Sequence, residues 1–268
     1  ITQYNTTTGA QAMFYTIENK DGDLAIVDGG YNCDGDISQV LDVIKKHGNH
    51  VTTWILTHPH HDHIGAFNGL YPYADKIGIK IDRIYATDAN RDRIVEMARD
   101  NTDDVETYDD FEKAIEHSAN VKYVHSGDRI KILNGLSAEV YHAWDHEVDE
   151  TDCNPCNNGS IMFKVFGHKD SMLFCADTEQ PIEKYIIARY KNELKADYVQ
   201  CGHHGSTGLS TDFYDLVGAT KGAFFDGPDS LYVKGNNGYT GYILMDYFKK
   251  KGVPIYKYST APNSITLK

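Results

Sequence analysis

Residues 58–63 read His-Pro-His-His-Asp-His and so concentrate side chains that bind metal ions. They directly follow the apolar run 54–57, which predicts a strand, and they lie where the next helix is expected to begin. Alternate positions of an extended turn can face the same way, so the first two ligands can hold one ion while the last two reach a second. Imidazole with carboxylate is a ligand set for Zn²⁺, and Mn or Fe also accept it. The sequence therefore predicts two metal ions, with zinc as the expected metal, at His58, His60, Asp62 and His63.

Polar side chains also end two later apolar runs. Asp177 follows the run 172–176, and a carboxylate at the mouth of a buried strand is costly unless it is paired or binds a metal ion. The alternative is that Asp177 caps the helix expected to follow it. Residues 203–206 read His-His-Gly-Ser and follow the run 198–201, so a second pair of histidines is expected at a strand end.

The elements that would position these residues occur in two comparable halves of the chain. Apolar runs at 12–18, 24–30 and 54–57 predict the first strands, and apolar residues at helical spacing predict a helix that Asp36 caps and that ends near Gly48. Further strands are expected at 81–87, 121–125, 129–133, 137–141, 160–167, 171–176, 197–200, 222–225, 254–258 and 264–267. Further helices are expected at 91–99, 105–118, 181–190, 211–217 and 238–251. Ligands at the carboxyl ends of strands are where α/β layers normally place their chemistry.

Length, charge and hydropathy narrow the class of protein. A chain of 268 residues with 41% hydrophobic residues can bury a sizeable core, and residues 1–268 are expected to form one domain. No apolar run approaches the roughly 18 residues needed to span a bilayer. The net charge of −13 without a basic stripe argues against an extended nucleic-acid surface. A small or locally engaged phosphorylated substrate stays compatible with this charge, because metal ions supply positive charge.

The cysteines and the first residue bear on the redox state and the cellular location of the protein. Five scattered cysteines are too few for a disulfide framework, although Cys153 and Cys156 could close a local disulfide or stay reduced. The chain starts at Ile1 without Met. This favours an extracellular or cell-surface location after removal of a signal over a cytoplasmic one, and an expression boundary is the alternative.

Four motifs together resemble the metallo-β-lactamase superfamily. They are Asp28-Gly29-Gly30, the pattern at 58–63, residues 157–177 and the pattern at 203–206. The resemblance covers most of the chain and implies an α/β fold, the four-layer αββα sandwich. It implies that Asp28 orients a ligand as a hydrogen-bond acceptor. It further implies that the first ion is held by His58, His60 and Asp177, and that the second is held by Asp62, His63, Asp177 and His204.

The resemblance also assigns roles around the substrate. The His-Gly pair at 204–205 places the ligand at His204 and leaves His203 to face the substrate as a hydrogen-bond donor or acid, with the reverse order left open. Asn157 and Ser206 are expected to contact the substrate. The residues expected to act in catalysis are Asp62, Asp177 and His203.

One departure from the family pattern bears on the substrate. Many members carry another ligand histidine roughly 20 to 25 residues before the bridging aspartate, whereas residues 157–163 here contain none. His142 and His146 are the nearest alternatives. The pattern instead resembles a branch that includes the hydrolase domains of competence-type DNA-uptake proteins and the phosphorylcholine esterases. This implies a phosphoesterase that cleaves a phosphodiester or phosphorylcholine-type ester with a metal-bound hydroxide. The alternatives are an acyl hydrolase, lactonase-like or β-lactamase-like, and a metal-binding module without turnover.

Overall fold

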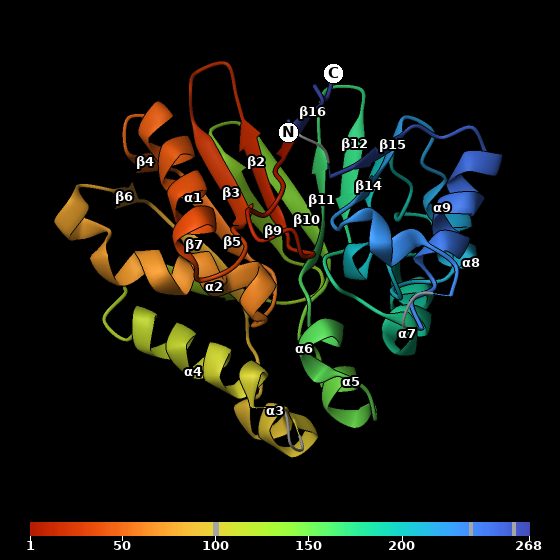
Figure 1. Cartoon of the computed structure of the whole chain (residues 1–268), viewed down its shortest axis with the longest axis horizontal. Coiled ribbons are helices and arrows are strands. Elements are labelled where there is room, and N and C mark those ends of the chain that lie inside the picture. The colour runs from red at the N-terminus through yellow and green to blue at the C-terminus, as the bar shows by residue number, and fades with distance from the viewer. Residues whose placement is uncertain (99–101, 236–237, 259–260) are drawn as a thin grey trace.

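Two seven-stranded mixed sheets form the centre of the molecule in the computed structural model, which describes residues 1–98, 102–235, 238–258 and 261–268 (Figure 1). In order across the sheet, the first contains β16 (Asn263–Ser264), β1 (Thr2–Gln3), β2 (Phe14–Glu18), β3 (Leu24–Asp28), β5 (Thr53–Leu56), β7 (Ile84–Thr87) and β8 (Val121–Val124). The second contains β15 (Ile255–Lys257), β14 (Gly222–Phe225), β13 (Tyr198–Gln200), β12 (Ser171–Phe174), β11 (Met162–Phe166), β10 (Leu136–His142) and β9 (Arg129–Leu133). A further small sheet pairs β4 (His50–Val51) with β6 (Lys80–Ile81).

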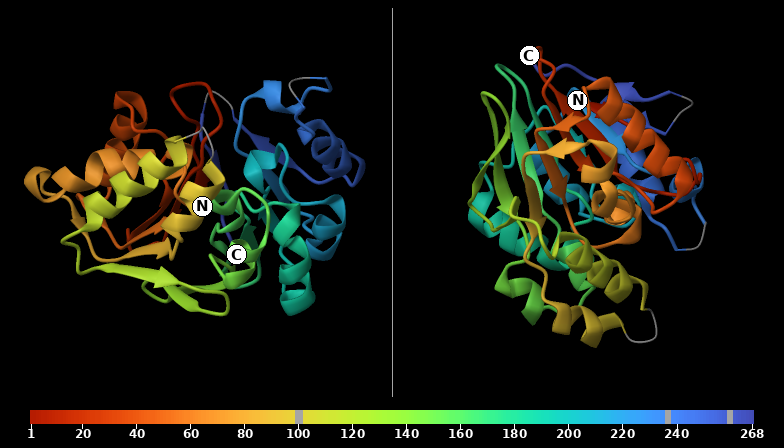
Figure 2. Two further views of the ribbon diagram at one scale, coloured as in Figure 1. Left: turned by 90° about the horizontal axis from the view of Figure 1, so that it is seen from below. Right: turned by 90° about the vertical axis from the view of Figure 1, so that its left-hand side faces the viewer.

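Helices cover the outer face of each sheet (Figure 2). The helices beside the first sheet are α1 (Asp34–Lys46), α2 (His61–Leu70) and α4 (Asp103–Ile115). Those beside the second are α5 (His146–Glu150), α6 (Pro155–Asn158), α7 (Gln180–Tyr190), α8 (Thr211–Val217) and α9 (Gly241–Lys250). Helix α3 (Arg91–Ala98) packs against α4, and its Ile94 joins the hydrophobic cluster on the outer face of the second sheet. Short 3-10 helices are η1 (Tyr71–Tyr73), η2 (Asp75–Ile77), η3 (His203–Gly205) and η4 (Asp229–Tyr232).

Apolar side chains point alternately to the two faces of each sheet, which explains the four-layer arrangement. In β3, Val27 packs into the cluster between the two sheets, while Ile26 faces the cluster beneath α1 and α2. In β12, Phe174 lies between the sheets, while Leu173 faces the cluster beneath α7 and α8. Because successive side chains of a strand point to opposite faces, each sheet must be covered on both sides. The predicted α/β class, with two sheets flanked by helices, is confirmed.

The start of α1 differs from the prediction. The helix begins at Asp34 with Cys33 as its N-cap, so the prediction that Asp36 caps it was wrong. Asp36 is buried inside the first turn, where its carboxylate accepts hydrogen bonds from the Thr7 backbone N–H (2.6 Å) and the Tyr31 backbone N–H (3.0 Å). Helices α5 and α6 were not predicted, because both are shorter than the window in which helical periodicity can be recognised. Within the described ranges, none of the helices combines the length and the apolar character needed to cross a membrane.

Candidate metal centre

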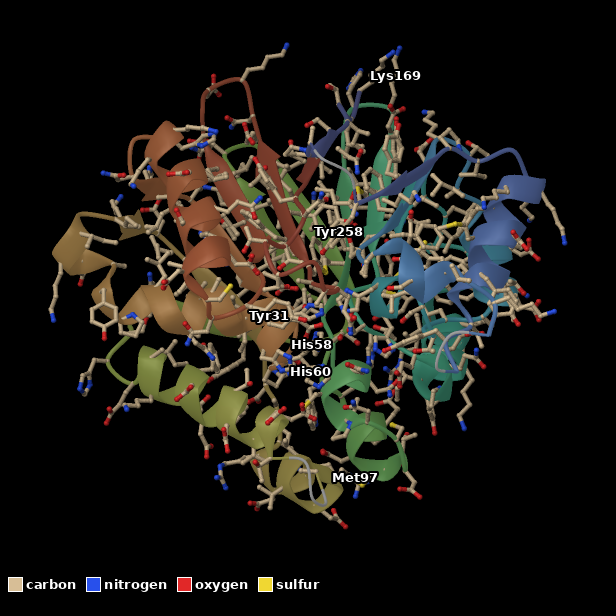
Figure 3. All side chains as sticks on the ribbon, viewed as in Figure 1. Tyr31, His58, His60, Met97, Lys169 and Tyr258 are labelled. Carbon is tan, nitrogen blue, oxygen red and sulfur yellow. The ribbon has the colours of Figure 1, made fainter. Side chains whose placement is uncertain are left out.

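The six predicted metal ligands come together beneath the two sheets, where Figure 3 places His58 and His60 side by side between α2 and α6. The segment after β5 and the first turn of α2 provide four of them. The turn after β12 provides Asp177, and η3 after β13 provides His204. The donor atoms form two groups, in each of which all atoms lie within 4.8 Å of one another: His58, His60 and Asp177 in the first, and Asp62, His63 and His204 in the second.

Asp177 lies between the two groups. Its Oδ1 atom is 3.2 Å from His63 Nε2, and its Oδ2 atom is 3.2 Å from His204 Nε2 and 3.9 Å from His58 Nε2. The alternative that Asp177 caps the next helix was wrong, because the N-cap of α7 is Glu179. Asp177 therefore has the position that a carboxylate bridging two ions would need.

The unpaired atoms of this centre fit a metal ion. His58 Nε2 is buried without a hydrogen-bond partner, and the equally buried Asp177 Oδ1 has only the His63 ring nitrogen, 3.2 Å away, beside it. Leaving such groups unsatisfied costs on the order of 1–3 kcal/mol each, and more when the group is charged. Divalent cations would satisfy these atoms, and the mixture of imidazole and carboxylate is one that Zn²⁺, Fe and Mn accept.

The charged groups of the centre shift one another's pKa values. Burial alone would raise the pKa of Asp177, but the His204 and His63 imidazoles outweigh burial and hold this pKa well below its usual range. Burial would lower the pKa of His63, but the Asp177 and Asp28 carboxylates reverse this and raise it well above its usual value. Burial, reinforced by His63, lowers the pKa of His58. A metal ion at His63 must therefore displace a proton, so metal affinity is expected to fall as the pH falls.

Asp28 fixes the orientation of His63. Its Oδ2 atom is 2.7 Å from His63 Nδ1, and its two oxygens accept hydrogen bonds from the Thr57 backbone N–H (2.8 Å) and the Thr57 hydroxyl (2.7 Å). The Trp54 indole N–H donates to the Asp28 carbonyl at 2.8 Å. With Nδ1–H donating to the carboxylate, His63 presents Nε2 to the metal centre, which is the role that the sequence predicts for Asp28.

We expect Asp28→Asn to weaken metal binding about 10- to 100-fold, because the amide supports the His63 ring less well than the carboxylate does. Asp28 has a left-handed backbone with φ of 54°, a conformation that asparagine tolerates. The substitution therefore tests the charge without adding backbone strain. Chelator competition with the purified chain measures the affinity, and wild-type affinity in Asp28→Asn would contradict the orienting role.

His203 lies beside the two groups of ligands. Its Nδ1 atom is 2.9 Å from Glu179 Oε1 and 2.7 Å from the Thr207 hydroxyl, and its Nε2 atom is 4.0 Å from Asp177 Oδ2. The His203 side chain is 22% exposed, whereas that of His204 is 1% exposed. This arrangement favours His204 as the ligand and His203 as the group that faces a substrate.

The turn that carries both histidines has a strained backbone. His203 and His204 have left-handed φ values of 49° and 55°, and Gly205 follows with 76°. Left-handed non-glycine residues cost of order 1–3 kcal/mol each and persist where the surroundings hold them. Here the Tyr232 hydroxyl donates to the His204 carbonyl (2.8 Å), and the Ser206 hydroxyl donates to the His203 carbonyl (2.7 Å). Ser206 is thus buried and supports the turn, and its predicted contact with the substrate stays a prediction.

Asn157 is linked to His203 through the Glu179 carboxylate, while the two histidines considered as alternatives do not join the centre. The Asn157 amide donates to Glu179 Oε1 at 3.1 Å, and its carbonyl oxygen is buried without a partner. His142 Nε2 is 2.6 Å from the Asn158 carbonyl, and the His146 side chain is 73% exposed. Neither His142 nor His146 belongs to a ligand group within the described ranges.

A buried polar network that the sequence analysis missed holds the strand ends in place. The Gln200 side-chain carbonyl accepts from the Ala176 backbone N–H (2.7 Å), and its amide donates to Asp226 Oδ2 (2.9 Å). Asp226 also accepts from the Tyr15 hydroxyl at 2.5 Å. Ala176 has a left-handed φ of 46° and directly precedes Asp177. The only sequence signal for this network was a glutamine inside an otherwise apolar strand.

Comparisons with known proteins agree with this arrangement. The metallo-beta-lactamase fold protein YhfI from Bacillus subtilis is 12% identical with a TM-score of 0.56, and the match covers 94% of this chain and 91% of that one. A diphosphatase from the PhnP family is 12% identical with a TM-score of 0.51, covering 96% and 85%. A variant of CmlA beta-hydroxylase is 10% identical with a TM-score of 0.57, covering 98% of this chain and 53% of that one. At these identities the likeness shows the fold alone.

The family itself follows from the sequence profile. No curated protein matches the sequence. The profile of the metallo-beta-lactamase superfamily matches residues 7–223, which include all six candidate ligands. The chain belongs to the metallo-beta-lactamase superfamily.

Proposed function

We propose that this protein is a dinuclear metal-dependent phosphoesterase that cleaves a phosphodiester or phosphorylcholine-type ester. The observation that carries the proposal is the composition of the first ligand group, in which two histidines and the shared Asp177 are joined by no third histidine among the described residues. An ion held by so few protein ligands keeps a coordination position for a substrate oxygen. The second group, with Asp62, His63 and His204, supplies a second ion beside it.

The residues of the centre have distinct tasks in this reaction. Two ions in these groups would supply positive charge for the phosphoryl oxygens and lower the pKa of a water molecule toward neutrality. Asp177 keeps the ligand groups together, and Asp62 completes the second group from the first turn of α2. His203 lies at the exposed side, where it can donate a hydrogen bond to a phosphoryl oxygen or a proton to the leaving group. The Glu179 carboxylate lies 2.9 Å from His203 Nδ1 and so holds the ring with Nε2 on the side of Asp177.

Proteins of the same fold support the proposal that this protein is a hydrolase, and experiment must identify its substrate. Metal-dependent hydrolysis is the common activity of the superfamily, and one protein of similar fold is a diphosphatase. The similar beta-hydroxylase shows that the same fold also serves other chemistry. We propose zinc as the metal, with Mn or Fe as alternatives that the same ligands accept. The branch that includes competence-type hydrolase domains and phosphorylcholine esterases belongs to the same proposal.

The net charge of the chain bears on which class of phosphoester it can bind. The net charge of −13 disfavours long duplex DNA, whose binding needs a basic track. A small ester, or a substrate engaged only at the scissile group, requires positive charge only at the metal centre. We therefore propose a small or locally engaged phosphoester.

A panel of chromogenic esters tests the function. We expect the zinc-loaded chain to hydrolyse bis-(p-nitrophenyl) phosphate or p-nitrophenyl phosphorylcholine, and to act little on a chromogenic cephalosporin or a lactone. Metal-free protein is the control, and elemental analysis should find at least two ions per chain in the active preparation. Efficient cephalosporin or lactone hydrolysis with inert phosphoesters would favour the acyl hydrolase alternative instead. Two bound ions without turnover of any ester would favour a metal-binding module.

A further inference from the structure

A third group of metal-binding side chains lies next to the first ligand group. His60, Asp104 and Cys156 each place a donor atom within 4.8 Å of the other two. They come from three separate elements, since His60 precedes α2, Asp104 lies in the first turn of α4 and Cys156 belongs to α6. Nothing in the sequence brings these residues together, so the fold alone creates the group.

The donor atoms of this group face one another in the interior, and the His60–Asp104 ion pair is the contact that joins two of them. His60 Nε2 is buried and lies 3.3 Å from Asp104 Oδ1, but it makes no hydrogen bond. Cys156 is fully buried and forms no disulfide. A buried ring nitrogen, a carboxylate and a thiol whose donor atoms face one another resemble the ligand set of a zinc-type ion.

A cavity gives this group access to solvent. The cavity has a volume of about 420 Å³, and Asp104 forms part of its wall together with Met97, Asn154 and Pro155. Cys153 also lines it, three residues before Cys156. Figure 3 shows Met97, a residue of α3, at the lower edge of the molecule. A hydrated cation can therefore approach Asp104 from outside without passing through the dinuclear centre.

We propose that His60, Asp104 and Cys156 form a third cation site, suited to Zn²⁺, Co²⁺ or Cd²⁺. Nε2 of His60 lies 3.3 Å from Asp104 Oδ1 and would serve this site, which would leave Nδ1 for the first ligand group, so that one ring would link two ions. Cation binding releases the Cys156 thiol proton and the remaining ring proton of His60 to solvent, because both groups bind metal only when deprotonated. This site goes beyond the proposed phosphoesterase activity and does not depend on which ester is cleaved.

Cobalt titration of the metal-free full-length chain tests the site. We expect about three Co²⁺ ions per chain at saturation and a near-ultraviolet band from thiolate-to-cobalt charge transfer. Cys156→Ser should abolish the band and lower the stoichiometry by about one ion. Cys153→Ser is the matched control, because Cys153 lines the same cavity but lies outside the ligand group, and it should keep both the band and the third ion.

A second variant covers the case in which Cys156→Ser fails to fold. Asp104→Asn should weaken binding of the third ion about 10- to 100-fold, so that the band grows in only at higher cobalt. Asp110→Asn, an exposed position on the same helix, should titrate like the wild type. Two ions with no thiolate band at saturating cobalt would overturn the proposal, and so would a band that survives Cys156→Ser. A Cys156-dependent band with only two ions in total would refute the sharing of His60. Absence of the third ion would refute only the third cation site. The hydrolysis of the chromogenic esters would still test the proposed phosphoesterase function separately.

Discussion

Asp177→Asn is expected to lower kcat/KM for phosphodiester hydrolysis by about three orders of magnitude while the chain stays folded. Asp177 Oδ1 and Oδ2 lie 3.2 Å from nitrogen atoms of His63 and His204, so this one carboxylate contacts two histidines of the second ligand group. Asparagine keeps the shape of the side chain and removes the negative charge that would balance two cations. The backbone N–H of residue 177 can still donate to the Ser160 hydroxyl (3.2 Å), so the turn itself should persist.

Activity and metal content should be measured on the same preparation. Asp170→Asn is a suitable control, because Asp170 directly precedes strand β12 while Asp177 follows its other end. Asp170 pairs with Lys221 at 2.6 Å, far from the ligands, and its replacement should leave metal content and rate near wild type. If Asp177→Asn kept both ions and full turnover, the bridging role would be refuted.

The ligands that the sequence predicts best are those that local geometry brings together. Residues 58–63 are contiguous, and the strand before them and the helix after them already determine where their side chains can reach. The strand ends before Asp177 and His204 were also visible as apolar runs that stop at a polar residue. Their convergence follows from strand pairing, since β12 and β13 are parallel neighbours and end at the same edge.

Residues that reach the site only through the packing of distant elements could not be predicted from the sequence. Asp104 lies near the start of α4, in a charged stretch that resembles the solvated face of a helix. Its position beside His60 depends on the packing of α4 against α2, where the Asn68 amide donates to the Thr107 carbonyl at 3.0 Å. No pattern in one sequence shows which helix covers which strand. Glu179 contacts both His203 and Asn157, and no feature of the sequence distinguishes it from other carboxylates near a helix start.

The sequence pattern left the order of the histidine pair open, and the structure provides a sharper test of it. His204→Ala should lower the metal content by about one ion and reduce the rate by more than the neighbouring substitution does. His204 Nε2 lies 3.1 Å from Asp62 Oδ2 and 3.2 Å from Asp177 Oδ2, inside the second ligand group. His203→Ala should keep both ions and lower kcat about 10²- to 10⁴-fold, the range typical of a lost general acid or hydrogen-bond donor.

The two variants control each other. Both positions have left-handed backbones with φ of 49° and 55°, so alanine leaves similar strain at each and any common loss of stability cancels in the comparison. What differs is the side chain, since His204 is enclosed by carboxylates while His203 Nδ1 faces Glu179 and the ring is partly exposed. Metal content by elemental analysis, with kcat measured at saturating zinc, separates a lost ligand from a lost acid. Loss of an ion in His203→Ala together with full metal content in His204→Ala would reverse the assignment. It would then place the substrate on the buried side of the turn, where the side chain of residue 204 is only 1% exposed.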